Sequence, residues 1–306
     1  MSPSPIRISS NLDHLFPDVR HMIDMPAEAR IRHVQTDFWI AYEGAANALK
    51  MLHDILGQPR NARMESRLLV GRSLNGKSTI LKEFKEAHPA TVDESGRVTD
   101  PVVLMQWPDK PDERSFWSAF LIAMSIPHRA AADPRQLKQQ AIEAFIANRS
   151  RMLLIDEIHN ILLGHALAQR QCLGLLKNLH NDLRVGIVVA GTADALRALR
   201  TDIQVATRFK AFPLHPWKLN RAYRELLGTL EANIPLAKPS NLSHPDNALR
   251  ILENSERTIG GTVDYVRALA KIAIEEGRDR IEPDIFERAR LSSVLAWTAK
   301  EEKFDI

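Results

Sequence analysis

A short glycine motif constrains this 306-residue chain more than any other feature. Gly71 and Gly76 are separated by four residues, and Lys77 and Ser78 follow directly. This spacing lets successive backbone N–H groups turn toward one anion, and the lysine adds a positive charge beside it. The apolar run Leu68–Val70 precedes the motif and a helical pattern follows it, which is the context that a phosphate-binding loop requires. The sequence therefore predicts that the chain binds the phosphates of a nucleotide.

Each part of this loop has an expected role toward Mg-ATP. Lys77 is predicted to reach the β- and γ-phosphates and to act in catalysis, while Ser78 is predicted to ligate Mg²⁺. The helix that follows directs its positive end at the same anion. The residues expected to contact the nucleotide here are Gly71, Arg72, Ser73, Leu74, Asn75, Gly76, Lys77, Ser78 and Thr79.

A pair of carboxylates follows a second apolar run, Met152–Ile155. Side chains at the carboxyl ends of parallel strands project into the crevice where ligands bind. Asp156 is therefore predicted to hold Mg²⁺, and Glu157 to polarise the attacking water as general base. A helix-capping aspartate beside a solvated glutamate is the alternative, which the phosphate loop makes less favourable. The neighbouring His159 is expected to be a packed polar residue.

Apolar runs and helical patterns alternate through the first two thirds of the chain. Nearly continuous apolar runs are typical of strands in a parallel sheet covered on both faces. The predicted strands are Leu68–Val70, 102–107, 152–155, 185–190 and a short fifth near 211–214. This order predicts an α/β fold with a doubly wound parallel sheet over residues 36–217. Residues 1–35 are expected to be an N-terminal arm, and residues 218–306 a small all-α domain.

Composition narrows the classes of protein that remain. Cys172 is the single cysteine, so an intrachain disulfide and a metal site of several cysteines are excluded. The sequence contains neither a signal-peptide pattern nor an apolar run long enough for a membrane helix, which predicts a cytoplasmic protein without a membrane partner. The net charge of +3 permits binding to nucleic acid but does not require it.

Several later motifs add a family resemblance. They are Asp156–Asn160, Val189–Thr192, Ala206–Phe209 and Leu214–Trp217. Together with the phosphate loop they resemble the TniB family, the AAA+ regulators of transposition that are related to TnsC and MuB. The similarity runs from about residue 30 to about residue 270. It implies a P-loop AAA+ domain followed by a small C-terminal all-α lid domain.

The resemblance also implies roles for three more residues. Thr192 matches the sensor-1 position, which contacts the γ-phosphate or the attacking water, although it could instead cap the next helix. Arg208 matches the arginine finger, which acts on the nucleotide of a neighbouring subunit, although a surface ion pair is the alternative. The sensor-2 region departs from the family pattern, since Arg267 is the nearest arginine after Gly260 and Gly261.

The function implied by the resemblance is ATP-dependent regulation of DNA transposition. ATP-bound copies would form a homo-oligomer or helical filament on double-stranded target DNA, contacting its backbone without sequence preference. They would recruit or activate a DDE transposase of the TniA or TnsB kind, with a TniQ-like adaptor, and hydrolysis would dissolve the oligomer. Lys110 and Arg114 are the candidate DNA contacts, and Lys82, Lys85 and Arg97 lie elsewhere in the same half of the domain. A helicase-loader-like or STAND-like ATPase acting on protein partners is the alternative.

Overall fold

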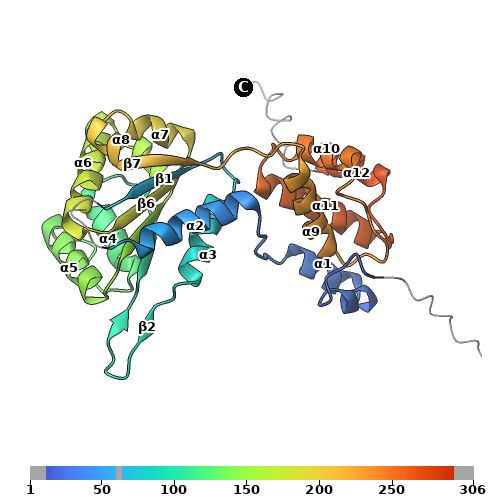
Figure 1. The fold of residues 1–306 in the computed structure, drawn as a ribbon, viewed down its shortest axis with the longest axis horizontal. Coiled ribbons are helices and arrows are strands. Elements are labelled where there is room, and N and C mark those ends of the chain that lie inside the picture. Colours follow the sequence, from blue (N-terminus) through green and yellow to red (C-terminus); the bar gives the residue numbers. More distant parts are fainter. Residues whose placement is uncertain (1–11, 60–63, 293–306) are drawn as a thin grey trace, which may run out of the picture. The chain divides into compact units, whose positions relative to one another are not determined.

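The computed structural model describes residues 12–59 and 64–292. The chain forms two compact units (Figure 1). One unit spans Glu43–Pro216, and the other combines Met1–Tyr42 with Trp217–Ile306. In the described part of the chain, no helix has both the length and the apolar character that a bilayer crossing needs.

The first unit is built on a five-stranded sheet with the order β4-β5-β6-β1-β7. Its strands are β1 (Ser66–Val70), β4 (Val102–Gln106), β5 (Met152–Asp156), β6 (Gly186–Gly191) and β7 (Phe209–Pro213). Every neighbouring pair is parallel. The three inner strands β5, β6 and β1 are buried almost throughout, which explains their continuous apolar runs. The expected doubly wound α/β sheet is confirmed, and the fifth strand is β7.

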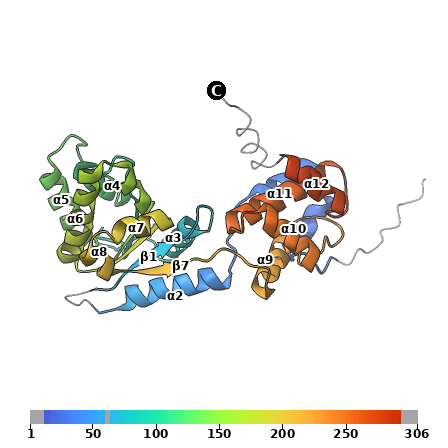
Figure 2. The same ribbon diagram turned by 90° about the horizontal axis from the view of Figure 1, so that it is seen from above.

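Helices cover both faces of this sheet. Alternate strand residues such as Leu68, Leu153 and Ile187 share a core with the helices of one face. These helices are α4 (Glu113–Ala123), α5 (Pro134–Ala147), α6 (Ala166–Leu183), α7 (Ala193–Leu199) and α8 (Ile203–Arg208). The other face is covered by α2 (Glu43–Gly57) and α3 (Lys77–Glu86). Figure 2 shows α2 on the side of the sheet opposite α6, α7 and α8.

Four short elements of this unit were not predicted. A two-stranded antiparallel hairpin of β2 (Thr91–Val92) and β3 (Val98–Thr99) projects from the unit (Figure 1). The 3-10 helix η2 (Ile158–Leu163) follows β5, and the short α8 precedes β7. Each is only a few residues long, so none produces a sustained periodic pattern in the sequence.

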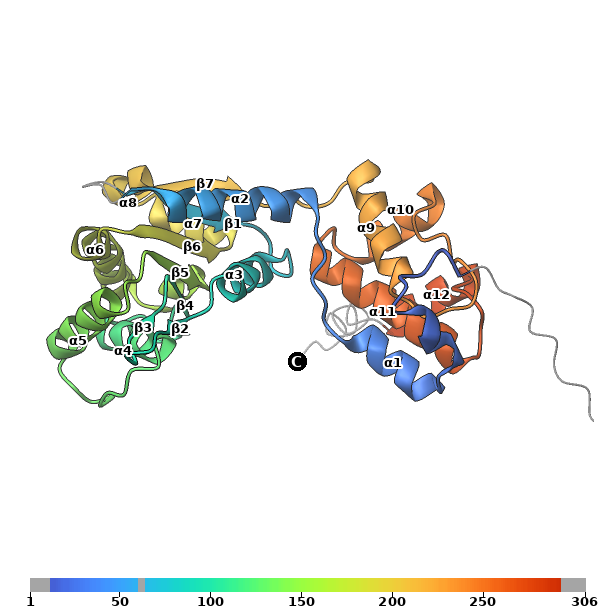
Figure 3. The same cartoon turned by 60° about the horizontal axis from the view of Figure 1, so that its bottom comes forward.

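The second unit is helical wherever the structure assigns it a regular element. It contains η1 (Arg20–Asp24), α1 (Ala27–Gln35), α9 (Arg221–Ala232), α10 (Pro245–Asn254), α11 (Ile259–Glu275) and α12 (Pro283–Ser292). The helical pattern of the sequence predicts a last helix over 283–299, of which residues 293–299 lie outside the described residues. Figure 3 shows α1 lying alongside α11.

The N-terminal segment differs from the expected arm. Val34 is buried in the same core as the helices of the second unit. The backbone N–H of Phe16 donates to the carbonyl of Ala232 at 2.9 Å, and Nε of Arg30 donates to the carbonyl of Pro235 at 3.0 Å. Residues 12–35 are therefore packed against the C-terminal helices, while residues 1–11 lie outside the described residues.

Candidate nucleotide-binding site

The strand order brings the predicted site residues to one edge of the sheet. The glycine loop follows β1, Thr192 follows β6, and Asp156 ends β5. Since β6 lies between β1 and β5, the carboxyl ends of these three neighbouring strands meet at the same edge. The loop, the sensor-1 candidate and the acidic pair are thus grouped by topology.

The loop has the backbone conformation that an anion-binding turn needs. Gly76 adopts a φ of 80°, a left-handed conformation that favours glycine, and it is the residue before α3. Leu74 also has a positive φ, 58°. No side chain caps the start of α3, so its first N–H groups remain available to an anion. At the other end of the loop, Gly71 N–H donates to the carbonyl of Gly191 at 3.2 Å, which ties the loop to β6.

The side chain of Asn75 faces the protein interior. It is only 3% exposed, and its Nδ2 donates to the carbonyls of Leu214 at 2.9 Å and His215 at 3.4 Å. A Cβ added to Gly71 would lie 3.3 Å from Leu214, so the loop and the chain leaving β7 are in close contact. The amide of Asn75 is therefore a brace that fixes the loop, and any contact it makes with a nucleotide comes from its backbone. The Leu214–Trp217 motif thus gains a structural role that sequence reasoning did not supply.

The side chain of Lys77, the first residue of α3, turns back to the loop. Its Nζ donates to the carbonyls of Gly71 at 3.0 Å and Arg72 at 2.7 Å, and the side chain is buried. Burial lowers the pKa of Lys77, while the charges of Asp156 and Glu157 act in the opposite direction. The ammonium group is thus within electrostatic reach of both carboxylates, as expected for a lysine that shares a nucleotide with them.

Ser78 and Asp156 offer the donors that Mg²⁺ prefers. Asp156 is buried, and its Oδ1 accepts a hydrogen bond from the N–H of Glu157 at 2.8 Å. Ser78, in the first turn of α3, is half-buried. Mg²⁺ in nucleotide sites is commonly held by one or two protein oxygens together with phosphates and water. Residues 12–59 and 64–292 contain no group of three or more histidine, cysteine or acidic side chains that would hold a metal without a nucleotide. The two residues fit Mg²⁺ that arrives with ATP.

Glu157 has an unpredicted partner. It lies just before η2 with a φ of 56°, and its Oε2 is 3.0 Å from Nε2 of His159. No sequence pattern indicates this contact, because it depends on the left-handed backbone conformation that the fold gives Glu157. In a regular helix, side chains two positions apart point to different faces.

Thr192 lies directly after β6 and before α7, and Arg208 is the last residue of α8. Thr192 precedes α7, but its side chain makes no capping hydrogen bond, so its hydroxyl is available to a ligand. Nη1 of Arg208, at the end of α8, donates to the carbonyl of Lys177 on α6 at 2.8 Å. The guanidinium keeps further donors beyond this bond. Both catalytic roles stay predictions.

Arg267 lies in the other unit and bonds within it. Its Nη2 donates to the carbonyl of Thr36 and to Oδ1 of Asp37, each at 2.9 Å. The side chain therefore ties α11 to the segment after α1. This contact supports a structural role, and the sensor-2 role stays a prediction.

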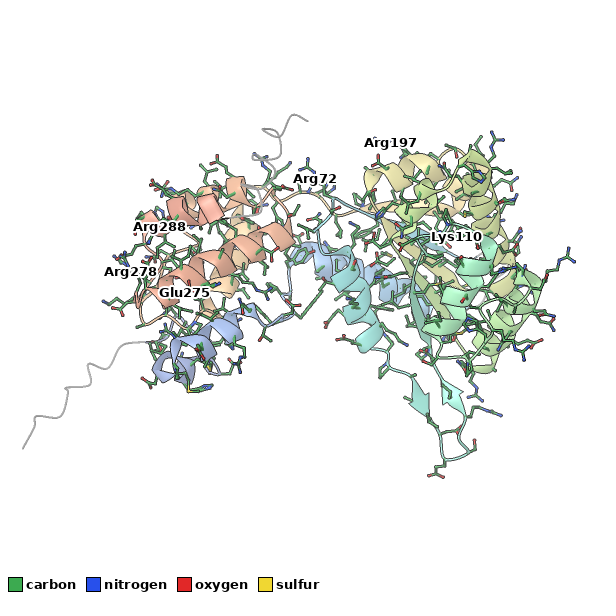
Figure 4. All side chains as sticks on the ribbon, turned by 180° about the vertical axis from the view of Figure 1, so that it is seen from behind. Arg72, Lys110, Arg197, Glu275, Arg278 and Arg288 are labelled. Carbon is green, nitrogen blue, oxygen red and sulfur yellow. The ribbon has the colours of Figure 1, made fainter. Side chains whose placement is uncertain are left out.

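The candidate DNA contacts lie before and at the start of α4. Lys110 is 83% exposed and 3.2 Å from Asp112, and Arg114 is exposed. Figure 4 shows Lys110 on the surface of its unit. Lys85 differs, because its Nζ is held by Asp100 at 2.5 Å and by the carbonyl of Val102 at 2.7 Å. Lys85 is thus engaged in an internal ion pair.

Comparison with known proteins agrees with this geometry. The family model described as "Bacterial TniB protein" matches residues 30–219. The chain belongs to the TniB family. No curated protein matches the chain.

Solved structures confirm the AAA+ fold of this TniB chain. The ORC1 protein of Aeropyrum pernix, solved in complex with DNA, is 15% identical with a TM-score of 0.62, covering 86% of this chain and 69% of that one. The ORC2 protein of the same organism, solved in ADPNP–ADP complexes, is 16% identical with a TM-score of 0.60, covering 84% and 71%. Cdc6p from Pyrobaculum aerophilum is 16% identical with a TM-score of 0.57, covering 84% and 69%. At these identities the likeness concerns the fold.

Proposed function

We propose that this TniB-family chain is a Mg-dependent ATPase that regulates DNA transposition. The observation that carries the proposal is the grouping of Lys77, Asp156 and Glu157 at one edge of the sheet, where Lys77 is buried within electrostatic reach of both carboxylates. Family membership over residues 30–219 supplies the link to transposition.

The site residues divide the work of hydrolysis. The loop N–H groups and the start of α3 would bind the phosphates, and Lys77 would turn from the loop carbonyls to the γ-phosphate. Ser78 and Asp156 would hold Mg²⁺, which neutralises charge on the phosphates. Glu157 would accept a proton from the attacking water, and the free hydroxyl of Thr192 would orient that water or the γ-phosphate.

Assembly would link this chemistry to DNA. Arg208 would reach the nucleotide of a neighbouring copy with the donors that Lys177 leaves free. Lys110 and Arg114 would contact the phosphates of double-stranded target DNA. The affinity for DNA would therefore not depend on the base sequence, and it would fall as the salt concentration rises. The ATP-bound homo-oligomer or filament would recruit or activate a TniA- or TnsB-like transposase, with a TniQ-like adaptor. Hydrolysis would then dissolve it.

Substitution of the general base tests the proposal that this chain hydrolyses ATP through Glu157. Glu157→Gln should retain ATP binding, because the carboxylate contacts water and not the phosphates, and it should lower kcat by about 10²- to 10⁴-fold. ATP affinity and turnover are measured by calorimetry and phosphate release, with Lys77→Ala as the binding-deficient control. Turnover that survives in Glu157→Gln would contradict the assignment of the base.

Assembly on duplex DNA tests the regulatory part. Sedimentation and electron microscopy with a non-hydrolysable ATP analogue should show oligomers on DNA, and each lost phosphate contact should reduce the salt slope of binding by about 1. Lys110→Ala and Arg114→Ala should do this, whereas the exposed Arg135→Ala on α5 is the matched control. A chain that stays monomeric with both ligands counts against the proposal. A rate of ATP hydrolysis that DNA does not change favours an ATPase acting on protein partners.

A further inference from the structure

We infer that His159 is a positioning residue that orients the general base Glu157. The inference rests on the proposed function, since it concerns the same site. Nε2 of His159 lies 3.0 Å from Oε2 of Glu157, within hydrogen-bond distance. Both side chains are about one third exposed, so the pair is neither fully solvated nor sealed in the core.

The surroundings of the imidazole decide which nitrogen donates. Nδ1 of His159 is buried and has no hydrogen-bond partner among the described residues. A proton on Nδ1 would be buried without an acceptor, and Nε2 would then turn a lone pair toward the carboxylate. The arrangement with the proton on Nε2 avoids both costs, so this tautomer is assigned from the hydrogen-bond pattern. His159 is thus a fixed donor to Glu157.

The cost of this arrangement argues for a role beyond space filling. A buried nitrogen without a partner is destabilising, and an apolar side chain would fill the same space without that cost. The gain is one hydrogen bond to Oε2, while Oε1 of Glu157 has no partner within residues 12–59 and 64–292. One carboxylate oxygen is therefore held and the other is left to accept a proton from water.

Packing holds the turn that carries His159 against the neighbouring strand. A Cβ added to Gly191 would lie 2.6 Å from Ile158 and 3.6 Å from the backbone nitrogen of His159. The turn that carries Glu157 and His159 therefore packs tightly against the end of β6, directly before Thr192. This contact places Glu157, its positioning residue and the sensor-1 candidate close together in a tightly packed part of the unit, and close packing helps to hold a catalytic base in position.

Two amide substitutions separate positioning from packing. The amide nitrogen of glutamine falls near the place of Nε2, whereas that of asparagine falls near the place of Nδ1. His159→Asn should lower kcat about tenfold, the equivalent of one charge-assisted hydrogen bond, and leave KM for ATP within about twofold. His159→Gln should retain kcat within about threefold of the original chain.

The experiment measures kcat and KM with and without duplex DNA, together with calorimetric affinity for a non-hydrolysable ATP analogue, which should not change in either variant. The same pair is made in the Glu157→Gln background, where His159→Asn should have no further effect. Equal losses in both amide variants, a change in affinity instead of kcat, or an unchanged kcat in His159→Asn would overturn the inference. If Glu157→Gln keeps full turnover, the proposed base itself fails, and this result is distinct from those three.

Discussion

The loop brace at Asn75 can be removed with a single substitution, Asn75→Ala. The side chain makes its two hydrogen bonds to the carbonyls of Leu214 and His215, outside the loop itself. We expect the variant to lose both stability and ATP affinity, because the phosphate donors of the loop would no longer be held in place.

The structure sets the size of the stability loss. Leu214 and Asn75 are both buried, so the Leu214 carbonyl loses a donor that water cannot readily replace. An unsatisfied buried polar group costs about 1–3 kcal/mol, and the small cavity left by the amide adds to this. We therefore expect the free energy of unfolding of the nucleotide-binding unit to fall by about 2–3 kcal/mol.

The assay needs a signal from this unit alone. Cys172 is 2% exposed within it, so thiol labelling in a urea series reports when the unit opens. The dissociation constant of an ATP analogue, measured in parallel, should rise up to about tenfold, the equivalent of 1.4 kcal/mol. Asn178→Ala, on the exposed side of α6, is the matched control and should change neither quantity. An opening free energy for Asn75→Ala within about 0.5 kcal/mol of the original chain would refute the brace.

Two further predictions follow from pKa values that burial shifts. Burial raises the pKa of the Cys172 thiol to about 11, so at pH 8 the native thiol should react at least about 100-fold more slowly with a disulfide reagent than in urea, as measured by absorbance. Comparable rates in both solutions would show that the unit is open. Burial raises the pKa of Tyr42 to about 12, above its ordinary value of 10.0, so its stabilising contribution is complete below pH 10 and is lost as pH rises through 12. Urea unfolding, followed by circular dichroism, measures the free energy of unfolding of the original chain and of Tyr42→Phe between pH 10 and pH 12. The original chain should lose up to about 2 kcal/mol more of this free energy than the variant. Equal losses in the two proteins would exclude the effect.

The sheet was the most predictable part of the fold. The cores of β1, β4, β5 and β6 coincide with apolar runs, because strands covered on both faces need apolar residues at every position. The edge strand β7 was harder to place, since Lys210 and Ala211 within it are exposed. Burial, and not strand propensity alone, therefore determined which strands the sequence revealed.

The N-terminal segment shows where local patterns mislead. Pro17 and Pro26 interrupt the apolar spacing of residues 1–35, and the sequence therefore predicts an N-terminal arm. In the structure Pro26 directly precedes α1, a position where proline does not disturb the helix. The partners of this segment, such as Ala232 and Pro235, are about 200 residues away in sequence, and no short-range pattern encodes them.

The site was predicted as a set of residues but not as a set of contacts. The motif spacing identified Lys77, Asp156 and Glu157, because phosphate and metal chemistry requires these side chains. It did not reveal that Asn75 turns inward, or that His159 bonds to Glu157. Both contacts depend on backbone conformation and on neighbouring strands that only the folded chain supplies.

Backbone strain in the nucleotide-binding unit occurs in the glycine loop and in the turn that carries Glu157. Among its described residues other than glycine, five have a positive φ: Leu74, Ser125, Arg149, Glu157 and Arg184. Ser125, Arg149 and Arg184 come just after α4, α5 and α6, where left-handed residues commonly end helices. Leu74 and Glu157 have no such explanation, and each costs about 1–2 kcal/mol against glycine. One lies in the glycine loop and the other carries the proposed base, so the fold sustains strain at the two places where a phosphate and an attacking water must be held in fixed positions.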